Sequence, residues 1–182
     1  MSNKINVFVI IKDHLRTLKN YSNGKTSLID VSILLLLPLI FVIGLAFYKY
    51  TINKEFVSLV VNFSSIVTSL LISVLVLIYD QYSKIDTQTL KKEVLGQLFS
   101  NVSYTILMGI ITVVFCLLLN IYPTDKTGNY EISAITFSIK EYEVSINLMI
   151  VLFTPFILFF LLQMIFTLFM VLRRLHIIFF AK

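Results

Sequence analysis

Four long runs of hydrophobic residues dominate the chain, with short polar stretches between them. They cover about residues 28–47, 56–79, 99–121 and 146–172. A run of about 18 or more apolar residues is long enough for a helix that crosses a bilayer. We therefore predict an all-α fold, an integral membrane four-helix bundle whose transmembrane domain extends over residues 28–172.

The segment before the first run, residues 1–27, has a different pattern. Hydrophobic residues within residues 4–19 recur at steps of three and four, which places them on one face of a helix: Phe8, Ile11, Leu15 and Leu18. Lys12, Arg16 and Lys19 lie toward the other side. This predicts an amphipathic N-terminal helix, which lies in the headgroup layer or packs against the protein's own cytoplasmic side.

Three polar segments connect or follow the predicted spans. Residues 80–98 form a connection, and residues 173–182 form a basic cytoplasmic tail. Residues 122–145 form an extracytoplasmic loop, which starts with the turn formers Pro123, Asp125, Gly128 and Asn129. Residues 130–144 then alternate β-branched or aromatic residues with polar ones, which predicts a small hairpin.

The distribution of Lys and Arg indicates an orientation. Eleven of these residues lie in the N-terminal segment, the 80–98 connection and the C-terminal tail, and four lie on the opposite side. Positive residues stay on the cytoplasmic side of short loops. We therefore expect a multi-pass protein with both termini in the cytoplasm.

Composition agrees with a membrane domain and little else. The chain has 182 residues, 58% hydrophobic and 14% charged, whereas soluble domains are about 45–50% apolar and about 25% charged. The net charge of +5 comes from Lys and Arg beside the spans, so we expect contact with lipid and no direct binding of nucleic acid. We expect His14 and His176 to be solvated near the cytoplasmic surface.

Two of the predicted spans each carry a stripe of small or polar residues. In the second span the stripe has spacings of 4, 3, 4 and 4: Ser58, Asn62, Ser65, Ser69 and Ser73. In the third span the spacings are 4, 4, 3, 4 and 4: Asn101, Thr105, Gly109, Thr112, Cys116 and Asn120. Such spacing keeps each stripe on one helical face, and we expect both faces to point away from lipid.

Three interpretations of the stripes remain open. Small residues allow close packing of helices, and Ser, Thr and Asn form hydrogen bonds between helices. The same faces can form an interface in a homo-oligomer. They can also line a water-filled pore. We see no ionisable side chain at mid-span, which disfavours a proton pump or a coupled transporter.

Two further residues within the spans have a predicted structural role. Pro38 lies near the middle of the first span and removes one backbone hydrogen bond. Neighbouring helices must then cover the carbonyl that is left exposed. Gln163 and Thr167 share a face of the last span, where we expect a buried bond between helices.

The sequence contains no set of residues that indicates an enzyme. Acidic residues are scattered over loops, so no pair indicates acid–base chemistry. The five glycines are isolated, so no glycine-rich loop for phosphates is present. A zinc site needs about four Cys, His or carboxylate ligands at defined spacing, and the sequence has no such set. We predict no catalytic, cofactor-binding or metal-binding residues.

The layout resembles the small four-span proteins of bacterial anti-phage operons, in particular the membrane subunit of the Kiwa defence system (KwaA-like). The resemblance depends on size, on both termini being inside, and on SLIDVSILLLLPLIFVIGL at 27–45 and NFSSIVTSLLISVLVLIYDQY at 62–82. These stretches cover the first half of the chain, and the second half adds only the number of spans.

The resemblance implies a non-enzymatic sensor in the bacterial inner membrane. Such a protein would form a homo-oligomer such as a tetramer and would respond to infection or membrane disturbance. It would recruit a cytosolic DNA-binding partner that blocks phage replication or transcription. Two alternatives remain: a pore-forming effector that depolarises the inner membrane, and a housekeeping channel or assembly factor.

Overall fold

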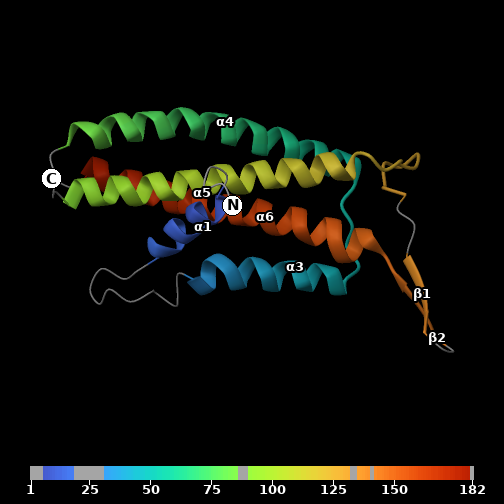
Figure 1. Cartoon of the computed structure of the whole chain (residues 1–182). Coiled ribbons are helices and arrows are strands. Elements are labelled where there is room, and N and C mark those ends of the chain that lie inside the picture. The colour runs from blue at the N-terminus through green and yellow to red at the C-terminus, as the bar shows by residue number, and fades with distance from the viewer. Residues whose placement is uncertain (1–5, 19–30, 86–89, 132–134, 140–141, 181–182) are drawn as a thin grey trace.

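The computed structural model describes residues 6–18, 31–85, 90–131, 135–139 and 142–180, and most of these are helical (Figure 1). The elements are α1 (Val7–Arg16), the π-helix η2 (Ser32–Leu36), α3 (Leu37–Phe47), α4 (Lys54–Lys84), α5 (Leu90–Leu119), strands β1 (Ile135–Ile139) and β2 (Tyr142–Ile146), the π-helix η3 (Met149–Phe153) and α6 (Thr154–Phe180).

Three helices in the described part of the chain are long and apolar enough to cross a membrane. They lie at Lys54–Lys84, Lys91–Leu119 and Met149–Ile177. The apolar helix Ser32–Phe47 is shorter. At 1.5 Å per residue it is about 24 Å long, against a hydrocarbon core of about 30 Å. Residues 28–30, which the hydrophobic pattern assigns to the same run, lie outside the described residues.

Helix α5 is the central helix of the bundle. It packs against both α4 and α6, while α3 packs along α6 and the short α1 packs on α5 (Figure 1). The end of α4, the start of α5 and the end of α6 lie together, and we call this the basic end after Lys84, Lys91 and Arg173. The hairpin lies at the opposite end, which we call the hairpin end.

The helices extend beyond the predicted spans. Most of the predicted polar connection 80–98 is helical, because α4 continues to Lys84 and α5 already begins at Leu90. Likewise α6 continues to Phe180, through most of the predicted tail. Hydropathy marks where apolar surroundings end, whereas a helix continues as long as its backbone hydrogen bonds and side-chain pairs allow. One such pair, Asp80 with Lys84, has an N–O distance of 2.6 Å.

The predicted hairpin is present between α5 and α6. Strands β1 and β2 are antiparallel, and their register pairs Ile135 with Ile146 and Ile139 with Tyr142. The turn before them is organised by Asp125, whose carboxylate accepts hydrogen bonds from the backbone N–H groups of Thr127 and Asn129, both at 2.8 Å. Gly128 in this turn has a φ of 81°, a conformation that glycine adopts without strain.

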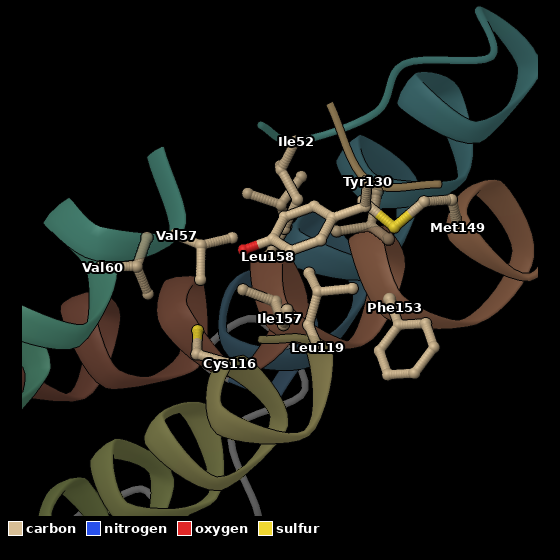
Figure 2. Close-up of a cluster of buried hydrophobic side chains, with 11 residues drawn as sticks. Ile52, Val57, Val60, Cys116, Leu119, Tyr130, Met149, Phe153, Ile157 and Leu158 are labelled. Atoms are coloured by element: carbon tan, nitrogen blue, oxygen red, sulfur yellow. The ribbon is translucent and has the colours of Figure 1, made fainter. Parts of the chain in front are cut away.

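A hydrophobic cluster closes the bundle near the hairpin end. Figure 2 shows the ring of Tyr130, which follows the turn, among side chains from α4, α5, η3 and α6. The cluster contains Ile52, Val57, Val60, Cys116, Leu119, Tyr130, Met149, Phe153, Ile157 and Leu158. The Tyr130 hydroxyl donates to the Asn120 Oδ1 atom at 2.7 Å. The turn is thereby fixed to the end of α5.

Two helices begin with a π-helical turn that a proline follows at the same distance. Pro38 comes two residues after η2, and Pro155 comes two residues after η3. Proline has no N–H to donate and its ring displaces the carbonyl four residues earlier, so the preceding turn widens. For Pro38 that carbonyl belongs to Leu34.

Candidate functional site

The N-terminal helix α1 packs against the helical bundle at about the level of Asn101 and Met108. Ile10 and Ile11 contact the buried cluster of Tyr104, Met108 and Met164, which belong to α5 and α6. His14 and Leu18 are buried. The outer face is exposed, and Phe8 is 80% exposed. Of the predicted apolar face, Ile11 and Leu18 turn inward, whereas Phe8 and Leu15 are exposed.

His14 is at the centre of this contact. Its side chain is fully buried, so the expectation of a solvated His14 was wrong. The imidazole lies flat on the ring of Tyr104, with 3.9 Å between ring centroids and 7° between the planes. Its Nδ1 atom lies 3.0 Å from the Oδ1 atom of Asn101. His14 is buried because α1 packs on α5, and the hydrophobic pattern of a short helix does not show such a contact.

Asn101 joins α1 to α5 through a second residue. The Thr17 hydroxyl lies 2.8 Å from the Asn101 Oδ1 atom and 2.7 Å from the carbonyl oxygen of His14. Asn101 itself is fully buried. One amide side chain of α5 therefore contacts both the side chain of His14 and Thr17, the residue that follows α1.

Arg174 of α6 holds the end of α1 from the other side. Its Nη2 atom donates to the carbonyl of Thr17 and its Nη1 atom to the carbonyl of Gln97, each at 2.9 Å. Carbonyls at a helix C-terminus have no partner within the helix and carry partial negative charge. A guanidinium satisfies this carbonyl and joins α1, α5 and α6 at one point.

The network continues from His14 toward the middle of the bundle. The Tyr104 hydroxyl donates to the Gln163 Oε1 atom at 3.3 Å, and the Gln163 Nε2 atom donates to the Leu34 carbonyl at 2.6 Å. This carbonyl is the one that Pro38 leaves without its helical partner. Gln163 is fully buried, and it joins η2 and α6 by the bond between helices that its position predicted.

Burial and charge together favour the neutral form of His14. They lower its pKa from 6.5 to about 4, because burial penalises the charged ring and the cation of Arg174 adds repulsion, against an opposing contribution from Asn101. The groups around His14 are Asn101 and Tyr104 of α5, Arg174 of α6 and Thr17 of α1.

The polar stripe of α5 faces the interior. Five of its six members are buried: Asn101, Thr105, Gly109, Thr112 and Cys116. Asn120 is exposed and bonds to Tyr130. The hydroxyls of Thr105 and Thr112 donate to the carbonyls of Asn101 and Met108 in the preceding turn, both at 2.8 Å. The hydroxyls of these threonines therefore have their hydrogen-bond partners within their own helix. Because the side chains are small, neighbouring helices can pack closely against them.

The polar stripe of α4 faces outward. All five members are exposed on the chain: Ser58, Asn62, Ser65, Ser69 and Ser73. The structure therefore does not bring the two stripes together, and within one chain the α4 stripe takes no part in packing against α5. A single helix cannot show which neighbour a polar face will meet, so equal spacing in two helices did not imply contact.

A different face of α4 packs on α5. Its residues follow alternate steps of three and four: Val57, Val60, Ser64, Val67, Leu71, Val74 and Ile78. That spacing is typical of helices that pack at a shallow angle, and it is the signal in the sequence that the polar stripe obscured. At its centre α4 lies close to α5. A Cβ atom placed on Gly109 of α5 would collide with the hydroxyl of Thr68 of α4.

The hydrogen bonds of this network connect helices to one another. Within the described residues, no three His, Cys, Asp or Glu side chains come together as metal ligands. The network combines the imidazole of His14 and the phenol of Tyr104 with amides, a hydroxyl and a guanidinium. Comparison of the chain with protein-family models, with curated proteins and with solved structures finds no match.

Proposed function

We propose that this chain is a non-enzymatic sensor subunit of a bacterial anti-phage defence system, embedded in the inner membrane by four spans. Three helices have the length and composition for crossing. For the fourth span we propose the apolar run 28–47, of which the structure describes the helix Ser32–Phe47. The excess of Lys and Arg at the basic end supports a cytoplasmic position for both termini.

The observation that carries the sensor role is the position of α1. A short N-terminal helix is held against two membrane-spanning helices through Asn101 and Arg174. A displacement of α5 relative to α6 would change both contacts, since each contact comes from a different helix. The end of α1 that Arg174 binds lies on the side of the basic end, from which it would present that change to a cytosolic partner. We propose a DNA-binding protein as that partner because the resemblance of the layout, including residues 27–45 and 62–82, to the Kiwa membrane subunit implies one.

We assign the outward stripe of α4 to contact with further copies of the chain. Helix α4 is the least covered of the three long helices, with 17% of its apolar window buried against 44% and 39% for the other two. Hydrocarbon offers no hydrogen-bonding partner to the amide of Asn62, and this side chain has no hydrogen bond among the described residues. A second copy offers the same row of small residues and the same amide. A tetramer built on this face is consistent with the proposal.

The defence role can be tested by measuring the efficiency of phage plating on cells that carry this gene, the gene next to it in the genome, or both. We expect protection only with both genes, because a sensor without its effector cannot stop replication. Affinity purification of the tagged chain from detergent should then recover the neighbour's product. Protection by this gene alone contradicts the two-component version.

A second candidate function follows from the same exposed stripe. If the α4 faces of several copies surround an axis, Ser58, Ser65 and Ser69 would line a pore. This function predicts that induction of the gene lowers the membrane potential, reported by a voltage-sensitive dye, with or without phage. An unchanged potential in both conditions contradicts the pore. The inward stripe of α5 is packed against neighbouring side chains and gives the pore no support.

A further inference from the structure

Among the described residues, the contact between α1 and the bundle leaves two buried polar atoms without a partner. They are the Nε2 atom of His14 and the Nδ2 atom of Asn101. Because the amide of Asn101 can be turned either way, one of its two polar atoms bonds to His14 and Thr17 and the other bonds to neither. In both orientations the Nε2 atom of His14 stays unpaired. An unsatisfied buried polar group weakens a contact by about 1–3 kcal/mol.

A proton on His14 would weaken the same contact further. The proton would enter at a buried atom with no acceptor beside it, and the positive ring would face Arg174. In the part of the chain that the structure describes, the other elements around the ring offer no compensating anion: α5 supplies Asn101 and Tyr104, and α4 supplies Val67 to the adjoining cluster. On α1 the carboxylate of Asp13 is paired with Arg16 at 3.2 Å on the exposed side.

The remaining contacts of α1 are few. Leu18, Ile10 and Ile11 are its buried or partly buried apolar residues against the bundle. Phe8, Val9 and Lys12 already face outward. A helix with apolar and basic residues on its exposed side has an alternative position in the headgroup layer of the membrane. In that layer Ile10 and Ile11 would contact lipid in place of the bundle.

We propose that α1 is a detachable latch, and that protonation of His14 releases it from Asn101 and Arg174 into the headgroup layer. The inference does not rest on the proposed role in defence, since it concerns only how α1 is held. It gives the molecule a response to acidification at the basic end. Leakage of protons through a damaged membrane is one source of such acidification.

The direction of the pH dependence follows from the two protonation equilibria. Docked His14 has a pKa of about 4, against 6.5 for an ordinary histidine. Docking of α1 requires the neutral imidazole. The free energy of docking is therefore most favourable above pH 6.5 and becomes less favourable as the pH falls from 6.5 toward 4. Between pH 7.5 and pH 5.5 the ratio of released to docked α1 should rise about tenfold.

The experiment measures a distance between α1 and α5 in nanodiscs. Nitroxide labels are attached to Lys12→Cys and Lys91→Cys, both exposed positions, in a Cys116→Ala background, and labelled chains are diluted with unlabelled ones. Double electron–electron resonance gives the docked and released fractions at pH 7.5 and 5.5. We expect the tenfold rise in the unaltered sequence and in His176→Asn, which removes the exposed histidine.

Two variants at His14 separate its titration from its packing. His14→Asn keeps a donor near the position of Nδ1, and His14→Phe keeps the ring on Tyr104; neither titrates. In both, we expect the ratio to change less than about twofold between the two pH values. An equal rise in these variants, or no rise in the unaltered sequence, overturns the proposal.

A second measurement decides the matter if both variants are released already at pH 7.5. The chain has two histidines, so in His176→Asn the ¹³C-labelled histidine signal belongs to His14 alone. At pH 5.5 we expect a neutral signal from docked chains and a protonated signal that grows with the released fraction. A single signal that titrates near 6.5 while α1 stays docked overturns the latch.

Discussion

The polar stripes of α4 and α5 have almost the same spacing and opposite surroundings. The α5 stripe lies inside the bundle, where Asn101, Thr105 and Gly109 are buried, whereas the members of the α4 stripe are exposed. Periodicity therefore identifies a special face of a membrane helix without showing what that face meets. The difference predicts that substitutions on inward polar residues change folding, and that substitutions on the outward stripe change assembly.

The largest effect is expected for Gln163→Leu. The change leaves the Tyr104 hydroxyl and the Leu34 carbonyl unpaired in the interior, and we expect it to lower the free energy of unfolding by about 2–4 kcal/mol. Helix circular dichroism during unfolding is the suitable measurement, because the chain has no tryptophan. In a Pro38→Ala background the cost should fall, since residue 38 then donates to Leu34. An undiminished cost would contradict this account of Pro38.

Asn101→Leu should have the next largest effect. Loss of the amide removes the partner of His14 Nδ1 and one contact of Thr17, so we expect the free energy of unfolding to fall by about 2 kcal/mol. Proteolysis near α1 should become faster, because this helix loses its main polar contact with α5. Asn120→Leu is the matched control on the same stripe, since Asn120 is exposed and contacts the turn instead. Equal effects on α1 from both variants would argue against a specific role for Asn101.

Gly109→Ala tests the close approach of α4 and α5. The new Cβ atom would collide with Thr68 and would lie 3.2 Å from the Met164 Sδ atom, so we expect a loss of about 1–3 kcal/mol from overpacking. Gly44→Ala is the control, because nothing lies within 4 Å of a Cβ atom there. That variant should be neutral or slightly more stable, as alanine favours the helix. A harmless Gly109→Ala would mean that α4 and α5 are less tightly packed than the structure shows.

The smallest effect on folding is expected for Asn62→Leu. The side chain is exposed on the chain, so we expect a change in the free energy of unfolding within about 0.5 kcal/mol. The mass of the complex in detergent, measured by light scattering, should instead shift toward smaller assemblies. Phe63→Leu, also exposed but on another side of α4, should leave the mass unchanged. An unchanged mass for Asn62→Leu would remove the α4 stripe from the proposed interface.

The sequence by itself determined the features that depend on neighbouring residues. Hydropathy located the apolar helices, the alternation at 130–144 predicted the hairpin, and the turn at Asp125 followed from its residue types. A buried bond between helices was also predicted for Gln163 from its position in the last span, but its partner, the Leu34 carbonyl, was not. These properties are local or additive along the chain.

Only the tertiary structure decided which faces meet. The contact of His14 with Asn101 joins residues 87 positions apart, and the contact of Gln163 with Leu34 joins residues 129 positions apart. The rotation of each helix about its axis depends on such distant partners, since many rotations bury similar apolar area in a helix that is apolar on nearly all sides. For that reason the polar stripe of α4 points outward, that of α5 points inward, and a short N-terminal helix with a buried histidine lies against the bundle.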